Sequence, residues 1–245
     1  MELRATFGNV YRKEKHCSVR PCMPRRMLVA MQMEEFMTRR YELRFNRMKG
    51  CKEYRERHSL FTDYRPVTAE AVKSICFEAQ LEGISAIEYD VQRYVDSRRV
   101  SHYWPIEEFL FDLPHWDGQD RIRALADCVP CENKEWRDFF YIWFLSMVAH
   151  WLQMDREHAN STSPLLVGPQ GCRKSSFCQS LLPPELRPYY VDGIDLGSRK
   201  DAEMALNRFA LINLDEFDSI PASRQPYLKN LLQKAKVTLR KPYGE

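Results

Sequence analysis

The feature that most constrains the fold is a glycine-containing loop between an apolar stretch and a helix-forming stretch. Pro164–Val167 is short and apolar, as in a buried strand, and it runs directly into Gly168-Pro-Gln-Gly-Cys-Arg-Lys-Ser175. Residues 174–182 then have a helical pattern that ends before Pro183. A strand, a glycine-containing loop, Lys-Ser and a helix in this order are the structural context of a phosphate-binding P-loop. We therefore predict a P-loop in this segment.

The chemistry of such a loop points to a nucleoside triphosphate, and we predict ATP with Mg²⁺ as the ligands. Backbone N–H groups of the loop would surround the β-phosphate at the positive end of the helix. Lys174 would bridge the β- and γ-phosphates, and the Ser175 hydroxyl would bind Mg²⁺. The predicted nucleotide-binding residues are Gly168, Pro169, Gln170, Gly171, Cys172, Arg173, Lys174, Ser175 and Ser176.

Arg173 is a departure from the usual pattern, which has glycine directly before the lysine. Glycine is favoured there because it tolerates positive φ and lets the backbone approach phosphate. Arginine fits if φ is negative at this position, and its guanidinium could then add a phosphate contact. The alternative is a weakened site.

A second apolar stretch, Phe209–Leu214, ends in two carboxylates, Asp215 and Glu216. We predict that Asp215 holds the magnesium, usually through water, and that Glu216 polarises the attacking water as a general base. The predicted catalytic residues are thus Glu216 and Lys174, and the predicted metal ligands are Ser175 and Asp215. A polar helix, 199–207, precedes this second strand, which is the order of elements in a parallel α/β sheet.

These elements predict an α/β protein with a P-loop NTPase core built on a parallel sheet that is incomplete at the C-terminus. The expected organisation is a basic flexible arm over 1–25, a helical region with a β-hairpin over 26–112, and a partial P-loop ATPase domain over 113–245. The hairpin pairs 41–46 with 52–57, where apolar and polar residues alternate around a Met-Lys-Gly turn.

The aromatic residues of a predicted helix over 134–152 recur at helical spacing, a pattern typical of a core. The longest run without charge, 139–154, is shorter than the ~20 apolar residues that a membrane span needs. The N-terminus also lacks the pattern of a signal peptide. We therefore expect a cytoplasmic protein that does not enter a membrane.

The eight cysteines are expected to be reduced thiols in that compartment. Cys128-Val-Pro-Cys131 has the spacing of half a zinc site, but no second pair follows at the spacing of a zinc ribbon or finger. We therefore favour two thiols over a zinc site.

Positive charge is concentrated in the first quarter of the chain. Residues 1–60 contain 15 Lys and Arg against 7 Asp and Glu, whereas the whole chain has a net charge of only +3. Clustered Lys and Arg indicate contact with a polyanion such as nucleic acid. A solubilising arm without a partner is the alternative.

Four segments together resemble the virulence-associated protein E family: Leu113-Pro-His-Trp-Asp-Gly-Gln-Asp-Arg-Ile122, the P-loop, Leu181-Leu-Pro-Pro184 and Ala210-Leu-Ile-Asn-Leu-Asp-Glu-Phe-Asp218. The resemblance covers the chain from about Glu34 onward and includes the long tryptophan-rich helix.

Such proteins resemble the superfamily 3 helicases of phage and plasmid primases, which are associated with mobile genetic elements. The resemblance implies ATP-driven work on single-stranded DNA, typically by a ring of identical subunits. It also implies that Lys236, Arg240 and Lys241 begin a segment leading to a DNA-facing hairpin. The sensor asparagine and the arginine finger of that family are expected beyond Glu245, so we expect the chain alone to hydrolyse ATP slowly.

Two other functions stay open. The first is a nucleic-acid-binding accessory protein that binds ATP but hardly hydrolyses it, which Arg173 favours. The second is a small-molecule kinase, although little chain remains after Asp215 to supply the substrate-binding lid that kinases need.

Overall fold

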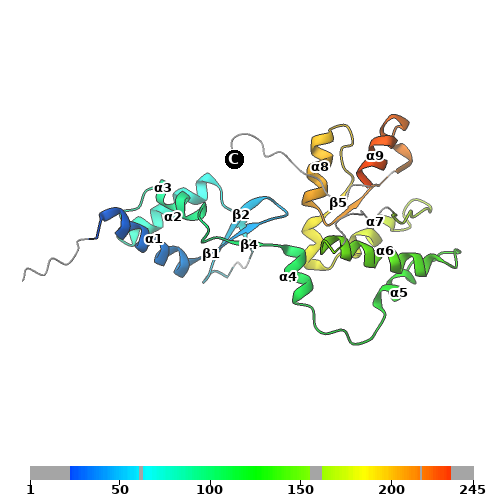
Figure 1. Ribbon diagram of the computed structural model, residues 1–245, viewed down its shortest axis with the longest axis horizontal. Helices are drawn as coiled ribbons and strands as arrows, with labels where there is room; N and C mark the ends of the chain where they lie inside the picture. The colour runs from blue at the N-terminus through cyan, green and yellow to red at the C-terminus, as the bar shows by residue number, and fades with distance from the viewer. Residues whose placement is uncertain (1–22, 61–62, 155–161, 216, 233–245) are drawn as a thin grey trace, which may run out of the picture.

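The protein is a mixed α/β molecule with a mostly helical part and a small mixed sheet. Its structure, a computed structural model, describes residues 23–60, 63–154, 162–215 and 217–232. An N-terminal part carries α1 to α3 and a four-stranded sheet, and α4 leads from it to a second part that carries α5 to α9 (Figure 1).

The N-terminal sheet confirms the predicted hairpin. Its strands are β1 (Tyr41–Asn46), β2 (Cys51–Glu56), β3 (Arg65–Pro66) and β4 (Ser101–Tyr103), in the order β3-β2-β1-β4. β1 and β2 are antiparallel with Leu43 opposite Tyr54, and β4 joins the other edge of β1 in parallel. Gly50 has a φ of 67°, which closes the turn between β1 and β2 and which glycine adopts without strain.

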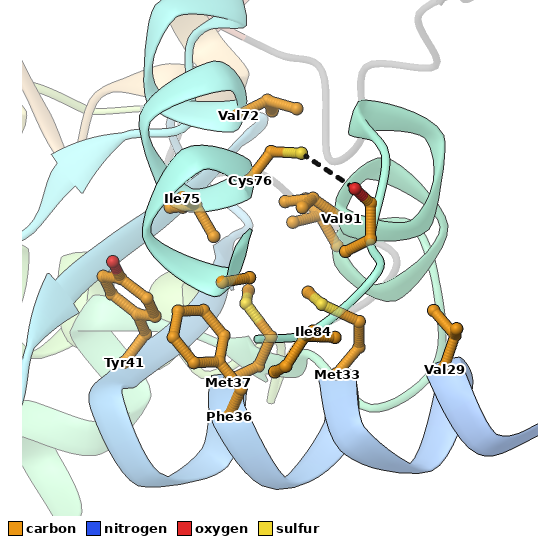
Figure 2. Packing of buried hydrophobic residues seen from close by; sticks show 13 residues of the cluster. Val29, Met33, Phe36, Met37, Tyr41, Val72, Ile75, Cys76, Ile84 and Val91 are labelled. Atoms are coloured by element: carbon orange, nitrogen blue, oxygen red, sulfur yellow. Dashed lines mark hydrogen bonds between the residues drawn. The ribbon is translucent and has the colours of Figure 1, made fainter. Parts of the chain in front are cut away.

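Three helices cover one face of this sheet: α1 (Arg25–Arg40), α2 (Ala69–Leu81) and α3 (Glu88–Val95). Figure 2 shows the core between them, where Met33, Phe36 and Met37 of α1 point toward Ile75 of α2 and Val91 of α3. Complete burial of one such side chain contributes about 1.5–3 kcal/mol. The core therefore stabilises the N-terminal part independently of the P-loop segment.

The second part consists mainly of helices around one short pair of strands. Its elements are α4 (Pro105–Phe111), α5 (Arg121–Ala126), α6 (Trp136–Trp151), α7 (Lys174–Ser180), the 3-10 helix η1 (Pro184–Tyr189), β5 (Tyr190–Asp192), α8 (Arg199–Arg208), β6 (Leu211–Asn213), the 3-10 helices η2 (Phe217–Ser219) and η3 (Ala222–Arg224), and α9 (Gln225–Leu232).

The aromatic stripe of α6 forms the core beneath the P-loop helix. Phe140 is at the centre, with its ring 5.6 Å from that of Trp143 and 6.1 Å from that of Phe177 on α7. Leu181, directly after α7, is buried in the same cluster. The prediction that the aromatic residues of this helix pack in a core is confirmed for Phe140 and Trp143 but wrong for Phe139, which is 59% exposed.

The parallel sheet of the second part is smaller than predicted. β5 and β6 are parallel, with Asp192 opposite Asn213. The predicted strand over 164–167 is wrong, because residues 162–169 form no strand and pair with none of the described ones. Leu165 is 66% exposed and Val167 88% exposed. A strand exists only through pairing with a neighbour, so an apolar sequence is not sufficient to form one.

The hairpin turn between β1 and β2 joins the two parts. Met48 in this turn is buried with Ile106 of α4 and with Leu182, Leu186 and Tyr189, which belong to the segment after α7. The N-terminal hairpin therefore packs directly against the P-loop part.

Packing of α6 leads to a stability prediction. Phe140 is 1% exposed and Phe139 is 59% exposed. We expect Phe140→Ala to lower the free energy of unfolding by about 3–5 kcal/mol through the cavity that it leaves. Phe139→Ala should change it by less than about 1 kcal/mol because little area is lost. Urea unfolding followed by circular dichroism measures both, and equal losses would contradict this packing.

Candidate nucleotide-binding site

α7, the helix of the predicted P-loop, begins at its predicted residue, Lys174. The loop turns at Gly171, whose φ is 82°, and at Arg173, whose φ and ψ are 65° and 29°. The amide of Phe177 then donates to the Arg173 carbonyl at 2.9 Å, which is the first helical hydrogen bond. α7 ends at Ser180, two residues earlier than predicted. Two residues with positive φ, Gly171 and Arg173, thus turn the chain from the loop into α7.

A negative φ was the condition under which Arg173 would fit the loop without strain, and this condition is not met. Its φ of 65° lies in the left-handed region, where a residue with a Cβ is strained by about 1–3 kcal/mol. The Arg173 side chain is exposed. The loop therefore keeps the backbone conformation of a glycine at this position and tolerates the strain.

Lys174 is folded back onto its own loop. Its ammonium group donates to the carbonyl oxygens of Gly168 at 2.8 Å and Pro169 at 3.1 Å, and it lies 3.7 Å from the Cys172 sulfur. Two of the three N–H donors of this ammonium are therefore taken by carbonyls of its own loop. The loop in this structure is thus closed around its own lysine.

Ser175 and Asp215 meet although they are 40 residues apart in sequence. The Ser175 hydroxyl donates to Oδ2 of Asp215 at 3.1 Å. Ser175 lies in the first turn of α7, and Asp215 follows the carboxyl end of β6. The structure therefore brings together the two predicted metal ligands.

A hydroxyl and a carboxylate are the oxygen donors that Mg²⁺ prefers, and this ion usually keeps several waters. Among the described residues, no three His, Cys, Asp or Glu side chains are grouped as a metal site. The pair formed by Ser175 and Asp215 suits a magnesium ion that takes its other ligands from phosphate and water.

The remaining predicted residues lie around this pair or outside the described ranges. Gly168, Pro169, Gln170 and Cys172 are exposed in the loop, and Ser176 is exposed on α7. The predicted general base Glu216 and the predicted DNA-contacting residues Lys236, Arg240 and Lys241 lie outside the described residues. Cys128 and Cys131 are exposed just after α5, away from the P-loop in sequence.

A second carboxylate at the same sheet edge was missed in the sequence. Oδ1 of Asp192 accepts hydrogen bonds from the Tyr190 hydroxyl at 2.6 Å and the Asn213 side-chain amide at 2.9 Å. Burial raises the pKa of the Tyr190 phenol, and the hydrogen bond to Asp192 raises it further. The sequence Tyr190-Val-Asp192 could have indicated it, because a short strand sequence there ends in a carboxylate, as the stretch before Asp215 does.

Cys178 on α7 faces both strand ends. Burial raises the pKa of its thiol, and the negative charges of Asp192 and Asp215 raise it further. The thiol is therefore protonated at neutral pH and is a poor nucleophile.

The left-handed conformation of Arg173 leads to a second prediction. Arg173→Gly should raise the free energy of unfolding by about 1 kcal/mol, because relief of the strained φ exceeds the entropy cost of glycine. Arg173→Ala is the matched control, since it removes the same charge but keeps the Cβ. Thermal unfolding of the three proteins measures the effect. An equal change in stability in both variants would mean that loss of the Arg173 charge, and not relief of backbone strain, causes the change.

Within the described residues, no helix is both long and apolar enough to cross a membrane. Comparison with curated proteins gives no match. Comparison with protein-family models matches residues 110–245 to the virulence-associated protein E-like domain. This match starts inside α4 and includes the loop, α7 and both strands of the parallel pair. It confirms the resemblance inferred from the motifs, and the chain belongs to the virulence-associated protein E-like domain family.

Proposed function

We propose that this chain binds ATP with Mg²⁺ at the loop that precedes α7, and that the whole protein couples ATP hydrolysis to work on single-stranded DNA. The observation that carries the proposal is the 3.1 Å hydrogen bond between Ser175 and Asp215. A glycine-containing loop with Lys-Ser occurs in many proteins by chance. A strand-end carboxylate held against that serine is the additional feature that a magnesium-phosphate site needs.

In this proposal each residue acts on one part of the ligand. Lys174 exchanges its contacts with the Gly168 and Pro169 carbonyls for phosphate oxygens, which replaces neutral acceptors with charged ones. Ser175 and Asp215 hold the metal, directly or through water. Glu216, next to Asp215 in sequence, accepts a proton from the attacking water.

The DNA part of the proposal depends on the family resemblance and on charge. The resemblance to superfamily 3 helicases suggests a ring of identical subunits, with single-stranded DNA contacted by the segment that contains Lys236, Arg240 and Lys241. Hydrolysis then depends on an arginine that a neighbouring subunit supplies, an effect worth about 10³–10⁵ in rate.

A second candidate is a protein that binds ATP and hardly hydrolyses it. Two observations favour it: the strained φ of Arg173 and the contacts of Lys174 with its own loop. Both favour a loop that closes slowly on phosphate, whereas neither argues against binding itself.

The binding site is tested by titration with a fluorescent ATP analogue. We expect Lys174→Ala to abolish binding, because it removes the counter-charge of the phosphates. Asp215→Asn should retain the weaker, magnesium-independent binding and lose the gain in affinity that Mg²⁺ gives. The control is Lys200→Ala, which removes an exposed lysine from α8. Wild-type affinity in Lys174→Ala would place the site elsewhere.

Hydrolysis is tested by phosphate release with and without single-stranded DNA. We expect a slow basal rate that single-stranded DNA increases, and we expect Glu216→Gln to remove release while changing nucleotide affinity less than about twofold. Binding without any DNA stimulation would favour the second candidate. Unchanged release by Glu216→Gln would show that another group activates the water.

A further inference from the structure

The β1–β2 hairpin contains two buried polar side chains that the proposed function does not use. Asn46 is 0% exposed and Glu53 is 1% exposed. Oε1 of Glu53 accepts from the Lys49 ammonium at 2.7 Å, and its Oε2 accepts from Arg44 at 3.0 Å and from Asn46 at 3.2 Å. Burial opposes ionisation of Glu53, yet the hydrogen bonds from Lys49 and Asn46 hold its pKa below the usual value.

Asn46 also forms the turn and links it to the P-loop part. Its side-chain carbonyl accepts from the amides of Met48 at 3.2 Å and Lys49 at 3.0 Å. Its side-chain amide donates to the hydroxyl of Tyr189 at 2.8 Å, across 143 residues of sequence. Because Asn46 is completely buried, each of these bonds lacks competition from water.

Tyr189 is held by one side-chain and one backbone hydrogen bond. Its hydroxyl is held by Asn46, and its backbone carbonyl accepts from the amide of Ala210 at 2.7 Å, directly before β6. Tyr189 ends η1 and is followed at once by β5. The position of the hairpin turn therefore helps to set where both strands of the parallel pair begin.

The segment before Tyr189 is fixed at the other end by two adjacent leucines. Leu181 is buried with Phe177 and the aromatic residues of α6, whereas Leu182 is buried with Met48 of the hairpin turn. The connection from α7 to β5 is thus held by the hairpin turn along most of its length. One of the two elements that it joins, α7, carries Lys174 and Ser175 of the proposed nucleotide site, and the other, β5, pairs with β6, the strand that leads to Asp215.

We propose that the hairpin turn is a positioning element of the nucleotide site, in which Asn46 acts through Tyr189 on the connection between α7 and β5. The proposal rests on ATP binding at the loop before α7. Since coupling between two sites is reciprocal, nucleotide binding must also stabilise the hairpin turn. The turn is thereby a route by which the N-terminal part senses whether nucleotide is bound.

The test uses Tyr189→Phe, which keeps the ring in the apolar cluster and removes only the hydroxyl that Asn46 contacts. Its matched control is Tyr94→Phe, which removes a hydroxyl that lies 3.4 Å from Thr38 in the N-terminal part. We expect Tyr189→Phe to weaken binding of the fluorescent ATP analogue about fivefold, the lower end of typical coupling, with no change in the control.

Hydrogen exchange of the wild-type chain supplies a readout that a purely structural contact would not change. With Mg²⁺ and the analogue added, we expect slower exchange at the turn amides of residues 47–51, and no such slowing in Tyr189→Phe. Unchanged exchange at the turn, or equal affinity in Tyr189→Phe and wild type, would overturn the coupling while leaving the binding site intact. A wild-type chain that binds no analogue would remove the proposed function and the coupling together.

Discussion

The arrangement of the second part depends on the burial of Leu181 and Leu182 in two different clusters. These neighbours leave the end of α7 in different directions, one into the aromatic core on α6 and the other into the cluster around the hairpin turn. Each buried leucine contributes about 1.5–3 kcal/mol, so neither cluster can move without loss in the other. The connection from α7 through η1 to β5 is consequently packed in two clusters, which hold the short strand β5 in place beside β6.

Sequence patterns correctly predicted the features that are formed by residues close together in the chain. The loop and the first residue of α7 were predictable because glycines, Lys174 and a helical pattern follow one another within a few residues. The β1–β2 hairpin was predictable for the same reason, since strand alternation and turn residues are adjacent in the chain. That Ser175 and Asp215 lie close together was inferred because the sequence analysis assigned both as ligands of one magnesium ion.

Features that depend on distant partners were missed or wrongly predicted. Val167 belongs to an apolar run, but strand formation depends on a neighbour that this run does not have in the described structure. Asp192 contacts Asn213 only because β5 lies beside β6. The contact of Asn46 with Tyr189 joins residues that no local pattern relates. Arg173 shows a further limit, because the backbone conformation of the loop overrides the preference of the residue that occupies it.

The inward contacts of Lys174 have a consequence for the kinetics of any phosphate ligand. Two of the three N–H donors contact loop carbonyls, so at the proposed nucleotide site the competent state is the fraction of molecules in which the lysine donates to phosphate instead. The apparent dissociation constant equals the intrinsic one divided by that fraction. Where release of the lysine precedes binding, the observed association rate reaches a ceiling at high ligand concentration. At the proposed site the main-chain carbonyls of Gly168 and Pro169 then act as weak internal competitors of the phosphate for the lysine.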